Sequence, residues 1–109
     1  MDITEQIATV IDELNEVSIK LWQCNEEAYK EFEKKCANWM GIINQVLTDL
    51  SIWKQQNNDI PLDVIFQQIK NLENALQDKD DFMLADTLKY EIGNTLNYYL
   101  EIVKEYEEK

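Results

Sequence analysis

The chain has 109 residues, of which 45% are apolar, and contains one proline and two glycines. This length suits one domain, and the scarcity of helix breakers favours long helices. With 22 acidic residues, 10 lysines and no arginine or histidine, the net charge is −12. That charge argues against nucleic acid and against an anionic membrane surface, because both attract cationic proteins. We expect a protein partner, either basic or carrying a hydrophobic segment.

The chain shows no sign of membrane insertion or export. No apolar run approaches the roughly 20 residues that a membrane span needs. The first ten residues, MDITEQIATV, begin acidic and lack the basic region of a signal peptide. We therefore predict a cytoplasmic protein.

The first predicted helix covers residues 2–24. Asp2 is a candidate N-cap, and Glu5 three positions later completes a pattern like the capping box. One helix face carries an unbroken apolar seam with alternating steps of three and four. Its members are Ile3, Ile7, Val10, Leu14, Val17, Leu21 and Cys24.

The second predicted helix covers residues 26–54 and has its own seam. We expect a turn at Asn25, because the two seams are out of phase there and Asn tolerates the left-handed conformation that ends helices. The alternative is one bent helix that continues to Gly41. The second seam consists of Tyr29, Phe32, Cys36, Trp39, Ile43, Val46, Leu50 and Trp53.

Two further helices are predicted over residues 60–77 and 81–106. The segment QQNNDIP, residues 55–61, is a loop, and Pro61 suits the first turn of the helix that follows. Four amphipathic helices with short turns bury their seams by packing as an all-α antiparallel bundle. The chain is therefore interpreted as a single helical-bundle domain over residues 1–109. The seams are Leu62, Ile65, Ile69, Leu72 and Leu76, then Ala85, Leu88, Ile92, Leu96, Tyr99, Val103 and Tyr106.

The acidic stretch DKDDFMLADTLKYEIGN, residues 78–94, is the segment that most resembles a functional site. A calcium loop needs an oxygen ligand at position five and glycine at position six, but counting from Asp78 these positions hold Phe82 and Met83. Capping explains the acidic residues instead, since Asp80 or Asp81 would accept from free amides at the start of the last helix.

The same stretch contains a polar stripe beside the last seam. Asp86 and Tyr90 lie one helical turn apart, while Glu91 projects about 100° away from Tyr90. We predict an Asp86–Tyr90 hydrogen bond that ties the helix to a neighbour, with a protein-docking role as the alternative and catalysis as the third. Trp22, Tyr90 and Tyr98 flank the seams, where aromatic residues either anchor interfaces or pack on a neighbouring helix.

Signatures of enzymes, metals and cofactors are missing from the sequence. Without histidine, the usual zinc, haem and di-iron ligand sets are incomplete, and no glycine-rich loop could hold a phosphate. Cys24 and Cys36 form no C-x-x-C pair and lie on apolar seams, so we expect both in the core. We therefore predict a non-catalytic protein without cofactor or metal.

The segment DDFMLADTLKYEIGNTL, residues 80–96, resembles a motif of small uncharacterised helical proteins of low-GC Gram-positive bacteria. The pattern there is approximately D-[YF]-x-L-L-A-D-x-L-x-Y-E-[IL], commonly followed by a proline. Asn94 lies about where that proline is expected, which suggests an unkinked helix through residues 93–95. The resemblance implies a helical domain of unknown function. The matching residues are Asp81, Phe82, Leu84, Ala85, Asp86, Leu88, Tyr90, Glu91 and Ile92.

The sequence therefore favours an acidic helical protein that acts through protein–protein interaction. The predicted docking or homodimer surface lies on the last helix, whose C-terminal part should extend beyond the shorter third helix and remain partly uncovered. Carboxylates around it would select a basic partner. In size, acidity and architecture the chain is also similar to cytoplasmic export chaperones such as the flagellin chaperone, which is the alternative function. The residues expected at the surface are Tyr98, Tyr99, Ile102 and Tyr106.

Overall fold

The computed structural model describes residues 2–56 and 59–107, and the side chains of these residues up to residue 105. The C-terminal helix is continuous from residue 81 to residue 107, because the residues at the two junctions between its three elements keep right-handed helical dihedral angles. The described residues contain no strand, so the predicted all-α bundle of four helices is confirmed. The elements are α1 (Ile3–Trp22), α2 (Glu26–Lys54), α3 (Leu62–Gln77), α4 (Asp81–Asp86), the π-helical segment η1 (Thr87–Ile92) and α5 (Gly93–Glu107).

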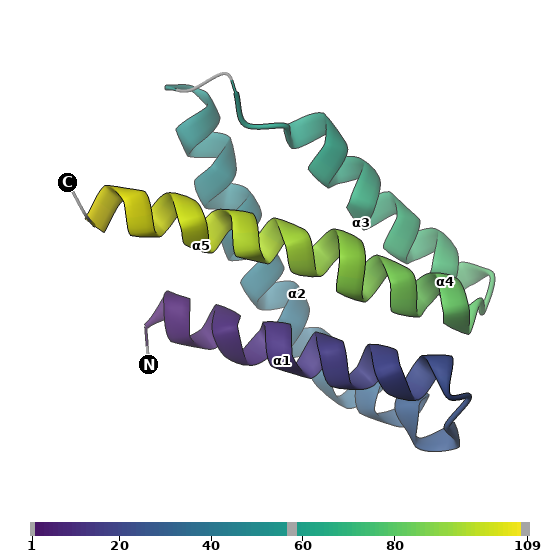
Figure 1. The fold of residues 1–109 in the computed structure, drawn as a ribbon. Helices are drawn as coiled ribbons and strands as arrows, with labels where there is room; N and C mark the ends of the chain where they lie inside the picture. Colours follow the sequence, from purple (N-terminus) through teal and green to yellow (C-terminus); the bar gives the residue numbers. More distant parts are fainter. Residues whose placement is uncertain (1, 57–58, 108–109) are drawn as a thin grey trace.

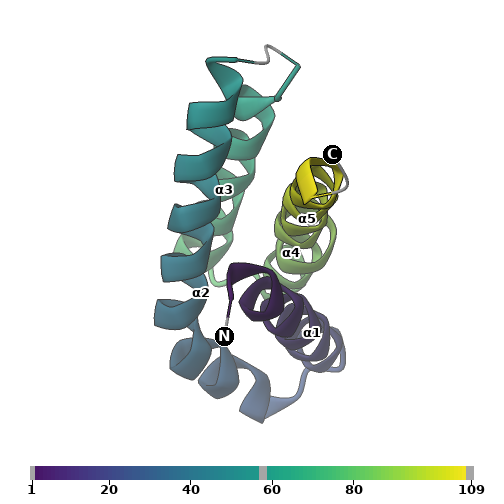
Figure 2. The ribbon, with the colours of Figure 1, turned by 90° about the vertical axis from the view of Figure 1, so that its left-hand side faces the viewer.

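The helices are arranged as two crossing pairs (Figure 1). α1 lies beside the helix formed by α4, η1 and α5 and runs in the opposite direction, while α2 and α3 form a hairpin. Figure 2 shows the first pair nearly end-on and the second pair from the side. The predicted antiparallel packing thus holds within each pair, whereas α2 crosses α1 and α5 obliquely.

The buried apolar side chains form one continuous cluster, to which each of the four helices contributes residues. Most of the predicted seam residues belong to it, and α1 contributes Ile7, Val10, Leu14, Val17 and Leu21. Burial of each such side chain stabilises the fold by about 1.5–3 kcal/mol relative to exposure. Tyr29 was expected on the seam of α2 but is exposed, because the neighbouring Ala28 takes the buried position in this turn.

The predicted turn between the first two helices is confirmed, so the alternative of one bent helix is wrong. The residue in the left-handed conformation is Cys24, with φ 55°, rather than Asn25. Asn25 instead caps α2, since its Oδ1 accepts from the Glu27 N–H at 2.8 Å. Cys24 lies beyond the end of α1 and is exposed, so its predicted burial is also wrong.

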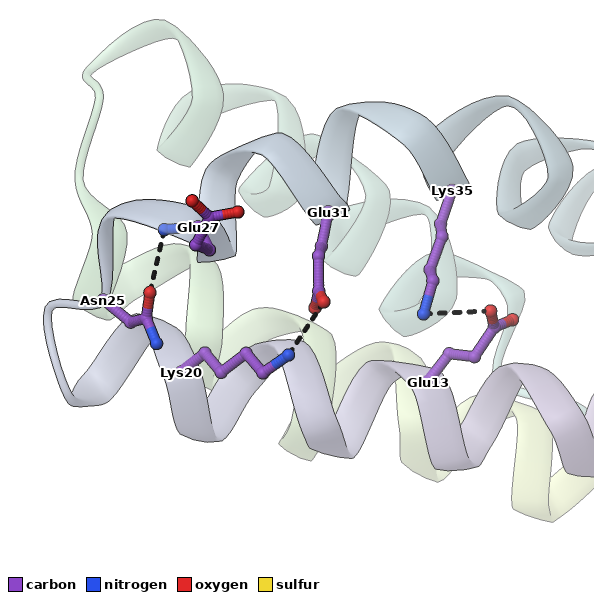
Figure 3. Close-up of polar contacts among 6 residues, drawn as sticks. All are labelled: Glu13, Lys20, Asn25, Glu27, Glu31 and Lys35. Carbon is purple, nitrogen blue, oxygen red and sulfur yellow. Dashed lines mark hydrogen bonds and ion pairs between the residues drawn. The ribbon is translucent and has the colours of Figure 1, made fainter.

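Two ion pairs join α1 to the first half of α2 (Figure 3). Lys20 Nζ lies 2.8 Å from Glu31 Oε1, and Lys35 Nζ lies 3.3 Å from Glu13 Oε2. The hydrogen bond within the first pair is the main cause that raises the pKa of Lys20 and lowers the pKa of Glu31. Because all four side chains are partly exposed, these pairs orient the helices more than they stabilise them.

Capping fixes the start of the last helix, as predicted for the acidic stretch. The Asp80 Oδ1 accepts from the Met83 N–H at 3.0 Å, and Lys79 just before it takes φ 54° to reverse the chain. The N-terminal cap of α1 follows the same rule, since Asp2 Oδ1 accepts from the Glu5 N–H at 2.9 Å. α3 begins at Leu62, two residues after the predicted start at residue 60, so Pro61 takes the N-cap position and does not lie in the first turn.

The last helix widens into a π-helical turn at η1, which the sequence pattern does not predict. The Gly93 N–H donates to the carbonyl of Leu88, five residues earlier. Just before this turn, the buried Ser18 hydroxyl of α1 donates to the carbonyl of Ala85 at 3.2 Å. π-Turns of this kind often occur at functional sites, so the surface over η1 is a candidate for such a site.

Candidate interaction site

The structure separates the three polar residues that the sequence placed in one stripe. Asp86 and Tyr90 face α1, where both contact Trp22. Glu91 faces α3 instead, and its Oε1 accepts from the Asn71 Nδ2 at 2.8 Å. The three side chains therefore do not converge on one pocket. Together these contacts hold the π-turn from both sides.

The hydrogen-bond partner of Asp86 is Trp22 rather than Tyr90, so that predicted bond is wrong. The indole Nε1 of Trp22, at the C-terminal end of α1, donates to Asp86 Oδ1 at 3.1 Å. The expected role of Asp86, tying the last helix to a neighbour, is present with a different partner. The only sequence signal for this pairing is the position of Trp22 beside its seam.

Trp22 and Tyr90 form a pair of rings on the outside of the molecule. Their centroids are 5.9 Å apart and the ring planes are inclined by 36°. The ammonium group of Lys89 lies 5.3 Å from the Trp22 centroid and 5.7 Å from the Tyr90 centroid, both within the range of a cation–π contact. The ring pair therefore already holds a cation, supplied by its own chain.

The surface around this pair is rich in exposed aromatic area. Phe82 and Tyr90 are 54% and 56% exposed, and with Asp86 between them they share one side of the last helix at four-residue spacing. We call the surface made by Trp22, Phe82, Asp86 and Tyr90 the aromatic face. It is the candidate functional site.

Tyr99, which the sequence placed both on the seam of the last helix and at the expected docking surface, belongs to the core. Tyr99 is only 2% exposed, its hydroxyl donates to Asp49 Oδ2 at 2.6 Å, and its ring stacks on Trp53 at 5.3 Å. Burial, and then the bond to Asp49, raise the pKa of Tyr99. α2 extends to Lys54, beyond the level of Tyr99, and so supplies the two covering residues Asp49 and Trp53.

Two other residues expected at that surface remain partly exposed. Tyr98 and Ile102 are half-buried and pack against the core. Tyr98 lines a pocket of about 170 Å³ together with Pro61 and Val64 at the start of α3. The side chain of Tyr106 lies outside the part of the chain that the structure describes.

A separate groove of about 650 Å³ lies between the start of α1 and the middle of α2. Its lining is uncharged and includes Thr9, Asn38, Gly41 and Gln45. A Cβ atom added at Gly41 would meet nothing within 4 Å. α2 therefore continues through Gly41 at an open position.

Among the described side chains, those of residues 2–56 and 59–105, no three acidic or cysteine groups converge as a possible metal site. None of the helices over the same residues combines the length and the apolar content that a membrane crossing requires. Comparison of the chain with protein-family models, with curated protein sequences and with solved structures gave no match.

Proposed function

We propose that the protein is a non-catalytic helical protein that binds a basic, partly apolar segment of another protein through the aromatic face. The observation that carries this proposal is the exposure of Phe82 and Tyr90 on one side of the last helix, next to the indole of Trp22. Exposed aromatic groups of this kind are typical anchors of protein interfaces, where they fill pockets or grooves of the partner.

The preorganisation of this surface supports the proposal. Trp22 is held by the bond to Asp86, and the π-turn below Tyr90 is fixed by Ser18 on one side and Asn71 on the other. A surface that is ordered before binding loses little conformational entropy when a partner docks. The net charge of −12 adds long-range attraction for a basic partner and repels acidic ones.

Binding of synthetic helical peptides tests the proposal. One peptide carries leucines on one face and arginines around them, and a second has glutamates in place of the arginines. The affinities are measured by fluorescence anisotropy for the wild-type protein, for Phe82→Ser and for Phe66→Ser. Phe66 is 51% exposed on α3 and so provides a matched control for a lost phenylalanine elsewhere on the surface.

We expect the basic peptide to bind the wild type and Phe66→Ser equally, and to bind Phe82→Ser at least tenfold more weakly, which corresponds to about 1.4 kcal/mol. The glutamate peptide should not bind. Equal loss in both serine variants, or no binding of the basic peptide at all, contradicts the proposal. A protein that forms a stable dimer through the aromatic face would indicate self-association instead.

A second candidate is a cytoplasmic chaperone that sequesters an aggregation-prone export substrate. It is favoured by exposed apolar side chains outside the aromatic face, namely Ile52 on α2 with Val64 and Phe66 on α3, which a long client could contact while wrapping around the bundle. A chaperone would bind long unfolded clients better than short helices and would suppress their aggregation.

A further inference from the structure

The ring pair within the aromatic face has a more specific chemical character than an apolar anchor. Two aromatic rings that face one position with their π-electrons attract a cation there. In the free protein that position is taken by Lys89, whose ammonium lies within 6 Å of both ring centroids. Lys89 is the residue before Tyr90 in η1, so its side chain reaches the rings without any contribution from a partner.

We propose that Trp22 and Tyr90 form a binding site for an arginine side chain of the partner's basic segment, and that Lys89 occupies this site in the free protein as a built-in competitor. The inference rests on the proposed function and names the group that the aromatic face recognises. A guanidinium group suits the site better than the ammonium of Lys89, because it is flat, stacks on aromatic rings and is more weakly hydrated.

Asp86 completes the site from the side of the last helix. Its Oδ1 accepts from the Trp22 indole, which holds the ring in place, and its negative charge lies at the edge of the ring pair. The planar, multidentate guanidinium can stack on a ring and donate to a carboxylate at the same time, whereas an ammonium group acts as a point charge. The three groups therefore favour arginine over lysine.

The partially exposed setting makes the Lys89 contact weak enough to be displaced. Exposed cation–π contacts are weak, so removal of the competitor should tighten binding about two- to fivefold. The variant Lys89→Gln tests this for the arginine peptide described above. Lys70→Gln is the matched control, since it removes the same charge from the exposed surface of α3 and reproduces any general electrostatic gain.

Substitution of the arginine charge provides an independent arm of the experiment. In a third peptide, called the citrulline peptide, the central arginine is replaced by citrulline, which has nearly the same shape but no charge. We expect this peptide to bind the wild type at least threefold more weakly, and the difference to disappear in Tyr90→Leu. Tyr90 is exposed, so this variant is expected to remain folded, while Tyr90→Phe, which keeps the ring, should behave as the wild type.

The outcomes separate the two proposals. Equal affinities of Lys89→Gln and Lys70→Gln, or of the arginine and citrulline peptides, overturn the arginine site while a loss in Phe82→Ser still supports the proposed function. Binding of neither peptide overturns both. Tighter binding by Lys89→Gln alone, together with discrimination against citrulline that depends on the Tyr90 ring, supports the arginine site.

Discussion

The indole of Trp22 donates a hydrogen bond to the carboxylate of Asp86 across 64 residues of sequence, and so joins the end of α1 to the last residue before the π-turn. Loss of this bond in Asp86→Ala should reduce the free energy of unfolding by about 1–2 kcal/mol, because a hydrogen bond to a charged group contributes more to stability than one between neutral groups. Asp86→Asn keeps an acceptor and should lose less. Urea denaturation of the three proteins provides the measurement.

A double-mutant cycle checks whether the two residues act through each other. Trp22→Phe keeps a ring and deletes the N–H donor. If the bond is formed in solution, the double variant Trp22→Phe/Asp86→Ala should be more stable than the sum of the two single losses implies, by about 0.5–1 kcal/mol. Strictly additive losses would show that the bond contributes nothing.

The buried Tyr99 hydroxyl predicts a loss of stability at alkaline pH. Burial and the bond to Asp49 raise its folded-state pKa above the ordinary value of 10.0, so the folded protein retains a proton that the unfolded chain releases. This contribution is fully present below pH 10 and is lost as the pH rises above it, with a slope of up to about 1.4 kcal/mol per pH unit.

Tyr99→Phe isolates this effect. The variant should lose about 1–2 kcal/mol below pH 10, because it leaves the partly buried Asp49 carboxylate without its donor, and its stability should decline less steeply above pH 10. Tyr90→Phe, with an exposed ring, is expected to keep the wild-type profile. Identical alkaline profiles of wild type and Tyr99→Phe would rule out Tyr99 as the cause.

Local chemistry and hydrophobic periodicity were enough to predict the four helices and the N-terminal caps of the first and the last. Asp2 and Asp80 accept from the amides three positions later, as their side-chain chemistry requires, and the apolar seams face one core. Periodicity could not decide which residue reverses the chain at the first turn. Either Cys24 or Asn25 fits there, and the capping function of Asn25 leaves the left-handed conformation to Cys24.

The candidate site was only partly predictable. The helical spacing placed Asp86 and Tyr90 on one face of the last helix, but their partner Trp22 comes from a helix whose rotation no local pattern fixes. The π-turn has the same three- and four-residue spacing of apolar side chains as an α-helix. The seam predicts burial of Tyr99, but its partner Asp49 comes from α2, whose oblique course (Figure 1) follows from packing of the whole bundle.

Gly41 is a position where stability should increase. It lies within α2, far from either end, in open space beside the groove with α1. Gly41→Ala should therefore raise the free energy of unfolding by about 0.5–1 kcal/mol, since alanine has the higher helix propensity and restricts the unfolded chain. Thermal and urea denaturation measure the change. A decrease would mean that the groove closes more tightly in solution than the structure describes.

Salt should stabilise the protein. Since 22 carboxylates face only 10 lysines, most acidic groups have no cationic partner and repel one another. Raising NaCl from about 0.02 M to about 0.2 M shortens the screening length and should raise the melting temperature. The ion pairs Lys20–Glu31 and Lys35–Glu13 oppose this trend only weakly, because they are partly exposed. A lower melting temperature at the higher salt concentration would contradict dominant repulsion.

The most direct test is to map the residues of the protein that contact a basic peptide. Backbone and indole signals in an NMR titration with the arginine peptide report these contacts residue by residue. The account predicts that the shifted signals lie in the last turn of α1 and in α4 and η1, with the indole signal of Trp22 among the largest changes. Shifts centred on α3, or on the groove between α1 and α2, would contradict it.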